Sequence, residues 1–404
     1  MNTAQDHFLS DNVARELFLN NNGEAMYAVS RSVLTQSAKM FVGAMSTLPY
    51  GGKVKYAVKA NPHPELVKII TDCGVGIDAS SFYEAELALR CGVEGKNISL
   101  TSQELPPNDE SFKNIIGKGV EFNATSLHQL KEYIRLFPGK SLGVRINPGL
   151  GSGMNNRLTT GGASASFGIW YEYIPEILSL CKNAGTDIAR LHTHIGSGTD
   201  PMEWISTLET TLDIAERLPD VTNVSIGGGF KSRYMPGEHD ADMTMIAEAL
   251  AKEVEKFKVQ TGREMSLEIE PGRLMVVHAG AIVARIIDKT DTGENGHQFL
   301  RVNTGMTEIL RPAMYGAQHG LRTVSSDNAR PLGDEDHFVV AGHCCESSDC
   351  LTTVKGDPEQ VEPRLLQNPE IGDILIIEDT GAYCYGMSAI GYNGYPAAKV
   401  LYVE

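Results

Sequence analysis

The sequence has few cysteines and no long apolar run, and each absence excludes a class of protein. Seven cysteines are scattered over 404 residues, an odd number that does not suit the disulfide framework of a small secreted domain. No segment approaches the roughly 18 consecutive apolar residues of a membrane-spanning helix, and residues 1–22 lack the apolar core of a signal peptide. We therefore expect a soluble, cytoplasmic protein with reduced thiols and no membrane partner.

Basic residues are also scarce relative to acidic ones. The chain has 35 lysines and arginines against 51 aspartates and glutamates, a formal net charge of -16. This balance does not provide the broad basic surface that binds nucleic acid, so we expect no nucleic-acid partner. Cys344, Cys345 and Cys350 lie close together, but no second ligand pair follows at zinc-site spacing, so we expect no metal site there.

Short β-like runs alternate with longer helical stretches between about residue 26 and residue 270. This alternation is typical of βαβ units, and eight or nine of them fit an α/β fold of the (β/α)8 TIM-barrel type better than the alternative, an open Rossmann-like sheet. The expected strands cover residues 25–30, 54–58, 75–78, 98–101, 121–123, 142–146, 189–195, 223–226 and 266–269. The expected helices cover residues 65–71, 82–90, 127–135, 174–183, 202–217 and 244–260.

The pattern changes after Glu270, where helical stretches become rare. Such a change predicts a second, mainly antiparallel β domain. Its expected strands cover residues 275–287, 299–302, 338–341, 374–377 and 399–403, and the acidic segment 323–336 is expected to be a surface loop. We therefore expect a barrel over residues 26–270 and a β-sandwich or barrel-like domain formed by residues 1–25 and 271–404.

Lys59 lies just after an alternating apolar run and before Asn61 and Pro62, which end the strand pattern. A lysine at the end of one strand is usually a solvated cap. In a βα barrel, however, the carboxyl ends of the strands form the active-site face. Asp78, His194, the glycines from 227 to 229 and Glu270 also come at the ends of expected strands. This shared position favours an active-site role for Lys59 over a solvated cap.

Two of these groups have local chemistry of their own. Gly227, Gly228 and Gly229 allow backbone N–H groups to approach a phosphate, although the same three glycines suit a tight turn equally well. Glu270 and Arg273 flank a Pro-Gly turn, and a carboxylate there could keep a pyridine nitrogen protonated. His192 and His194 share one strand face without nearby metal ligands, so we expect one to stack on a cofactor and the other to pack in the core.

The chain contains, in order, the motifs YAVKAN at 56–61, HIGS at 194–197, GGGF at 227–230 and EPGR at 270–273. Together they resemble the pyridoxal-phosphate-dependent decarboxylases with an alanine-racemase-like barrel, the ornithine/diaminopimelate/arginine decarboxylase family. The motifs RPAMY at 311–315, CESSD at 345–349 and GAY at 381–383 resemble the diaminopimelate branch more than the ornithine branch. The resemblance extends over about residues 26–395, which is nearly the whole chain.

This resemblance implies pyridoxal 5'-phosphate (PLP) as the cofactor. Lys59 would bind it as a Schiff base, Glu270 would pair with its ring nitrogen, and His194 would stack on its ring. The remaining residues that the resemblance assigns to cofactor binding are Asp78, Ser197, Gly227, Gly228, Gly229, Arg273 and Tyr383.

The resemblance also implies how an amino-acid substrate would be bound and protonated. Cys345 would donate a proton to the substrate carbon after carbon dioxide has left. Arg273, Arg311 and Tyr315 would grip the distal carboxylate, with Glu346 on the distal ammonium and Tyr383 nearby. Cys345 and Glu346 would come from the second subunit of a homodimer that shares its active sites across the interface.

The implied reaction is decarboxylation of meso-diaminopimelate to L-lysine. Four positions depart from the family pattern, namely Ala165, Ser166, Gly198 and Ser348, and they leave the substrate open. The alternatives are decarboxylation of ornithine, lysine, arginine or carboxynorspermidine. A different class of alternative is a non-catalytic regulatory homologue, which would be expected to lose the cofactor residues, and none of these is lost here.

Overall fold

The computed structural model describes residues 7–150, 161–194, 196 and 201–404, and the chain divides into two compact units. One unit comprises residues 35–231 and 239–275, and the other comprises residues 1–34, 232–238 and 276–404. In the described part of the chain, no helix has both the length and the apolar character needed to cross a membrane.

The first unit is a closed parallel barrel. Its strands run in the order β5-β4-β3-β2-β10-β9-β8-β6, and pairing of β5 with β6 closes the ring. These strands are β2 (Gly52–Ala57), β3 (Gly76–Ala79), β4 (Ile98–Leu100), β5 (Glu121–Ala124), β6 (Leu142–Asn147), β8 (Ile188–His192), β9 (Asn223–Ser225) and β10 (Ser266–Ile269). A short strand, β7 (Ile169–Trp170), pairs in parallel with the end of β6. The expected (β/α)8 barrel is confirmed.

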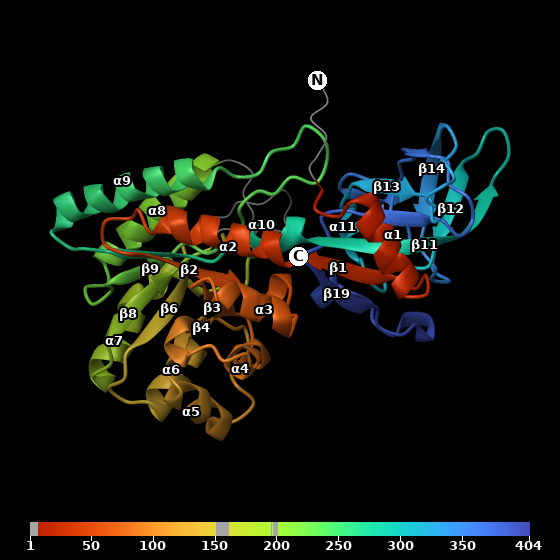
Figure 1. The fold of residues 1–404 in the computed structure, drawn as a ribbon. Coiled ribbons are helices and arrows are strands. Elements are labelled where there is room, and N and C mark those ends of the chain that lie inside the picture. The colour runs from red at the N-terminus through yellow and green to blue at the C-terminus, as the bar shows by residue number, and fades with distance from the viewer. Residues whose placement is uncertain (1–6, 151–160, 195, 197–200) are drawn as a thin grey trace. The chain divides into compact units, whose positions relative to one another are not determined.

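Helices alternate with the barrel strands along the chain (Figure 1). They are α2 (Arg31–Met45), α3 (Pro64–Thr71), α4 (Phe82–Arg90), α5 (Asp109–Gly117), α6 (Leu127–Leu136), α7 (Ile174–Ala184), α8 (Pro201–Glu216), α9 (Met243–Thr261) and the short α10 (Arg273–Val276). In α4, α5, α6 and α9, a polar side chain just before the helix accepts a backbone N–H; these side chains belong to Ser81, Asn108, Ser126 and Asp242. These caps fix where the βα loops before these four helices end.

The second unit is built on an eight-stranded sheet in which most neighbouring strands are antiparallel. Its strands are β1 (Met26–Ser30), β11 (Gly280–Asp291), β12 (Gln298–Val302), β13 (Leu321–Val324), β14 (Glu335–Ala341), β17 (Arg364–Gln367), β18 (Ile374–Ile377) and β19 (Lys399–Val403). A separate hairpin joins β15 (Thr353–Val354) and β16 (Asp357–Val361), and the helices are α1 (Asp11–Asn20) and α11 (Arg311–Tyr315).

Strand β11 shows why this sheet has two cores. Ile282 and Ile286 pack on one face with Phe338 and Leu375, whereas Val283 lies in a separate cluster on the other face. That second cluster includes Ala14 and Phe18 of α1, so the helix covers this face. Because both faces of the first part of β11 are buried, residues 280–284 are continuously apolar rather than alternating.

Several expected elements differ from the structure. The strand expected over 25–30 forms as β1, but it pairs with β11 and β19 in the β unit and not with a barrel strand. Residues 273–276 form α10, so the strand expected from 275 begins only at Gly280. The segment 323–336 is not wholly a loop, because β13 ends within it at Val324 and β14 begins within it at Glu335.

Candidate functional site

Lys59 lies at the carboxyl end of β2. The strand stops at Ala57, and a single 3-10 turn, Val58–Ala60, carries the exposed Lys59 side chain. Strand β2 pairs with β10, and the N–H of Ala57 donates to the carbonyl oxygen of Pro271 at 3.1 Å. The turn that carries Lys59 and the segment that follows β10 are therefore tied together at the same edge of the barrel.

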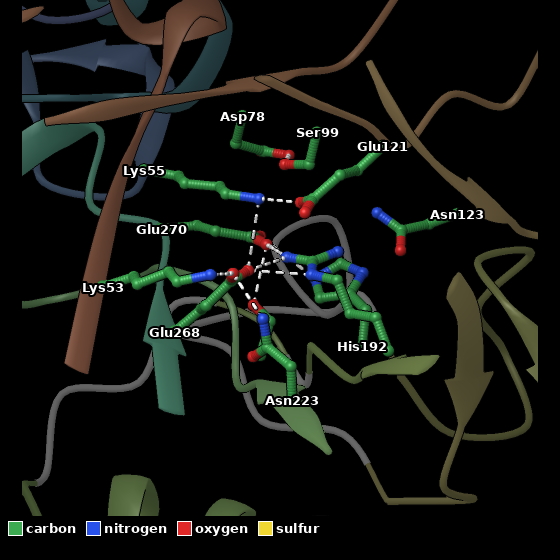
Figure 2. Close-up of polar contacts among 12 residues, drawn as sticks. Lys53, Lys55, Asp78, Ser99, Glu121, Asn123, His192, Asn223, Glu268 and Glu270 are labelled. Carbon is green, nitrogen blue, oxygen red and sulfur yellow. Dashed lines mark hydrogen bonds and ion pairs between the residues drawn. The ribbon is translucent and has the colours of Figure 1, made fainter. Parts of the chain in front are cut away.

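Glu270 follows β10 directly and is buried among donors (Figure 2). Its Oε1 accepts hydrogen bonds from Ser225 Oγ at 2.7 Å and Arg190 Nη2 at 2.9 Å, and its Oε2 lies 3.0 Å from His192 Nε2. Burial alone would raise the pKa of Glu270, but His192, Arg190 and Ser225 together lower this pKa well below its usual value. The carboxylate is therefore held in its charged form.

Asp78, near the end of β3, is a second buried carboxyl group with the opposite tendency. Burial, followed by the negative charge of Glu270, raises the pKa of Asp78 to about 8, although Lys59 opposes this shift. Ser99 Oγ donates to Asp78 Oδ1 at 3.4 Å. At neutral pH the site thus contains one ionised and one protonated carboxyl group, an arrangement that separates acceptor from donor.

His194 follows β8 and packs against the loop that follows β9. Gly227 has a φ of +74°, and a Cβ atom there would lie 2.5 Å from His194 Nδ1. A Cβ atom on Gly228 would lie 2.1 Å from the carbonyl oxygen of Glu270. Glycine is therefore required at these two positions for the loop to lie close to both residues. Burial, with the nearby charges of Arg145 and Lys59, lowers the pKa of His194 well below its usual value.

For the other barrel residues of the predicted site, the structure gives the position along the chain and few contacts. Gly229 also has positive φ, at +108°, and Arg273 is the first residue of α10. Ser197 and Gly198 lie outside the described residues. Ala165 and Ser166 lie after the end of a gap in the described chain, before Phe167, whose ring lies 5.0 Å from the guanidinium of Arg145.

In the β unit, Arg311 and Tyr315 are the first and last residues of α11. Arg311 is buried, and its Nη1 donates to His319 Nε2 at 2.7 Å. Its guanidinium also lies 4.6 Å from the centre of the Tyr234 ring. The helix ends at Gly316, which has a φ of +60°. Arg311 therefore has a defined orientation within this unit.

Cys345 and Glu346 share a loop between β14 and β15. Cys345 is exposed, and its backbone N–H donates to Asn393 Oδ1 at 2.8 Å. The Glu346 carboxylate accepts from Ser348 Oγ at 3.2 Å and from the Tyr392 hydroxyl at 3.1 Å. The backbone N–H of Ser348, followed by the hydroxyl groups of Tyr392 and Ser348, lowers the pKa of Glu346.

Tyr383 also belongs to the β unit, in the segment after β18. Its φ of +57° lies in the left-handed region, which is uncommon for a residue other than glycine. Nearby, a Cβ atom on Gly381 would lie 1.8 Å from the carbonyl oxygen of Val276, so the chain passes very close to that backbone.

The sequence did not single out Arg190, Ser225 or Arg145 as members of the site. Arg190 and Ser225 both donate to Glu270, and burial lowers the pKa of Arg145 to about 10. For Arg190, the available signal was its period-two spacing from His192 on the same strand. Within the described residues, no group of three or more His, Cys, Asp or Glu side chains could hold a metal ion.

A family model described as "Pyridoxal-dependent decarboxylase, pyridoxal binding domain" matches residues 35–277, which is more than half of the chain. A barrel with a lysine beside a buried, ionised carboxylate suits this class of enzyme, and the residues present fit its cofactor. The charged Glu270 complements a protonated ring nitrogen, and Lys59 offers an accessible amine.

Three similar proteins narrow the class further. The chain is 34% identical over 356 residues to a diaminopimelate decarboxylase of Streptomyces coelicolor, covering 87% of this chain and 79% of that protein. It is 31% identical over 394 residues to one of Methanothermobacter thermautotrophicus, covering 95% and 87%. A crystal structure of diaminopimelate decarboxylase superposes with a TM-score of 0.89 at 27% identity, covering 99% of this chain and 93% of that chain. The chain belongs to the pyridoxal-dependent decarboxylases and, within them, to the diaminopimelate decarboxylase family.

Proposed function

We propose that this protein converts meso-diaminopimelate to L-lysine and carbon dioxide. The observation that carries the proposal is that Lys59 and the buried, ionised Glu270 follow two paired strands, β2 and β10, at the same edge of the barrel. Bound PLP would supply the electron sink for the electrons of the broken carbon–carbon bond. Similarity to diaminopimelate decarboxylases over both units of the chain supports the choice of substrate.

In this proposal the barrel residues hold and orient the cofactor. The Lys59 amine would bind it covalently and exchange places with the substrate amine. Glu270 would keep the ring nitrogen protonated, and the neutral His194 ring would lie against the cofactor ring. The phosphate would be held by Ser197, Gly227, Gly228, Gly229 and Tyr383, with Asp78 and Arg273 supporting the site.

The residues of the second unit would recognise the substrate and deliver a proton. Arg311, whose guanidinium is already oriented by His319, would bind the distal carboxylate together with Arg273 and Tyr315. Glu346 would bind the distal ammonium, and Tyr383 would contribute to the same pocket. Cys345 would protonate the α-carbon from its thiol after carbon dioxide departs.

We further propose that the protein is a homodimer in which Cys345 and Glu346 complete the partner's site. Both residues lie on an exposed or half-buried loop, which is consistent with this role. Mixing Lys59→Ala subunits with Cys345→Ala subunits should then restore activity to at most about a quarter of the parent value, because only one kind of site in the mixed dimers is intact. Two inactive variants that remain inactive after mixing and subunit exchange would contradict shared sites.

The function itself is tested by measuring carbon dioxide release from meso-diaminopimelate by PLP-loaded parent protein. The Lys59→Ala variant is the matched comparison: it removes the amine and its methylene chain, and because the Lys59 side chain is exposed, little packing is lost. We expect release by the parent and a loss of at least about a thousandfold in the variant. A parent protein that binds no PLP would instead support the alternative of a regulatory homologue.

A further inference from the structure

The interior of the barrel contains charged side chains where most such barrels are filled by branched apolar residues. Lys55 of β2, Arg190 of β8 and Glu268 of β10 are 3%, 4% and 0% exposed. Each lies within its strand. The side chains of Lys55 and Glu268 point toward each other (Figure 2), and the guanidinium of Arg190 contacts Glu268. None of the three belongs to the motifs that defined the proposed function.

Charges of alternating sign form a series of contacts from the partly exposed Glu121 through these three residues to Glu270. Glu121 Oε2 lies 2.5 Å from Lys55 Nζ, and Lys55 Nζ lies 3.4 Å from Glu268 Oε2. Glu268 Oε2 is 2.7 Å from Arg190 Nη2, which is in turn 2.9 Å from Glu270 Oε1. Alternation lets each buried charge lie against the opposite charge, which offsets the cost of removing it from water.

Arg190 contacts both carboxylates with one planar group. Its Nε donates to Glu268 Oε2 at 2.8 Å, and its Nη2 donates to Glu270 Oε1 at 2.9 Å. A guanidinium can do this because its donors have a fixed, forked geometry, whereas a lysine ammonium is a single point charge. The orientation of Glu270 is therefore coupled through Arg190 to the position of Glu268.

Glu268 is itself firmly anchored. Asn223 Nδ2 donates to its Oε1 at 2.6 Å, and Lys53 Nζ lies 3.7 Å from the same oxygen. Although burial opposes ionisation, Arg190 and then Lys55 lower the pKa of Glu268 to about 2. Glu268 thus provides a fixed negative charge against which Arg190 is held.

We propose that Arg190, braced by Glu268, is a positioning residue that holds the Glu270 carboxylate in place for the cofactor's ring nitrogen. The inference rests on the proposed function, because it assumes that Glu270 faces the ring. Ser225 holds the same oxygen from β9, so Glu270 Oε1 is fixed from two strands. Arg190 does not need to touch the cofactor or the substrate for this role.

A purely structural role would be different: Arg190 would serve only to neutralise the buried Glu268. The double variant Arg190→Met/Glu268→Gln separates the two roles, because it removes both the arginine and the charge that needs neutralising. Glu268→Gln alone is the matched control: the glutamine amide oxygen can still accept the hydrogen bond from Arg190 Nε, so Arg190 stays braced against Glu270 while the charge of Glu268 is removed. For each protein, the measurements are the PLP dissociation constant, the visible absorbance of bound PLP, and the urea midpoint of the cofactor-free form.

We expect the double variant to bind PLP about tenfold or more weakly than the parent, with an altered absorbance spectrum, because a charged hydrogen bond to Glu270 is lost. Glu268→Gln should stay within about threefold of the parent, with an unchanged spectrum. A double variant that binds PLP within about twofold of the parent and shows the parent spectrum would overturn the positioning role. A parent that binds no PLP would refute the proposed function as well. Failure of the proposed function can therefore be distinguished from failure of the positioning role alone.

Arg190→Lys provides a second test that does not depend on how well the double variant folds. It keeps the positive charge but not the fork that reaches both carboxylates. We expect PLP binding about fivefold or more weaker than in the parent and a shifted absorbance spectrum. Parent-like binding and spectrum in this variant would mean that charge alone is sufficient, which would overturn the inference.

Discussion

Arg311 Nη1 donates a hydrogen bond to His319 Nε2 at 2.7 Å. His319 Nδ1 lies 2.9 Å from the carbonyl oxygen of Glu378, which can only accept, so the ring carries its proton on Nδ1 and accepts at Nε2. Tyr234 packs against the guanidinium from a different segment of the same unit. The arginine proposed to bind the distal carboxylate is thus oriented by a histidine that lies eight positions further along the chain.

Replacing His319 with leucine should weaken substrate binding more than it slows the chemical step. The leucine removes the acceptor that orients Arg311 while leaving the arginine charge in place. We expect the KM for meso-diaminopimelate to rise about tenfold and kcat to stay within about threefold of the parent. Steady-state kinetics at fixed PLP would check this, and an unchanged KM would contradict a role for His319 in orienting Arg311.

Asp349 organises the loop that carries Cys345. Its Oδ1 accepts the N–H of Met306 at 2.7 Å, and its Oδ2 accepts the N–H of Cys344 at 2.9 Å. Both oxygens therefore accept, and Asp349→Asn would place an amide N–H₂ against one of these donors. We expect kcat to fall about tenfold or more while the PLP dissociation constant stays within about twofold. The exposed Asp327→Asn is the control, and equal kcat values for both variants would contradict this account.

Ser348, one of the four departures from the family pattern, donates its hydroxyl hydrogen to Glu346 Oε1 at 3.2 Å. Tyr392 donates to the other oxygen of the same carboxylate. Ser348→Gly should loosen one side of Glu346 and raise the KM for meso-diaminopimelate by about two- to fivefold. A KM equal to that of the parent would show that this hydroxyl does not contribute to substrate binding.

The raised pKa of Asp78 predicts a specific dependence of stability on pH. An unfolded aspartate loses its proton near pH ~3.9, whereas the pKa of Asp78 is about 8 in the folded protein. Between these values the folded state binds one proton more than the unfolded state, so this group makes stability fall as pH rises.

Asp78→Asn removes that penalty. Its free energy of unfolding, relative to the parent, should therefore increase by up to about 1.4 kcal/mol per pH unit between about pH 5 and about pH 7. Urea titrations of cofactor-free parent and variant at several pH values within this window would measure the difference. A difference that stays constant across the window would contradict a raised pKa at Asp78.

The strands of the barrel could be predicted from the sequence because each is a short apolar run bounded by turn residues. The strand with which each one pairs could not be predicted. Residues 26–30 form a strand as expected, but it pairs with β11, more than 250 positions away, and no local sequence pattern indicates this pairing. Helix α5 was not among the expected helices, although its buried residues Phe112, Ile115 and Ile116 have the spacing of an amphipathic helix.

The candidate site also contains some residues that could be predicted from the sequence and others that could not. Lys59, Asp78 and Glu270 could be predicted because their positions at strand ends are visible in the sequence. Arg190 could not, because its burial depends on Glu268 and Glu270, which are 78 and 80 positions further along the chain. A charged residue within a strand gives no sign of whether such partners exist.

The most direct test of the central claim is the comparison of kcat/KM for meso-diaminopimelate with that for ornithine, lysine, arginine and carboxynorspermidine, using one preparation of PLP-loaded protein. The account predicts release of carbon dioxide with an equal amount of L-lysine from meso-diaminopimelate. It also predicts a kcat/KM at least about a hundredfold above that for any of the other four compounds, because Arg311 and Glu346 would recognise both distal charges. A higher kcat/KM for ornithine, lysine, arginine or carboxynorspermidine than for meso-diaminopimelate would contradict it.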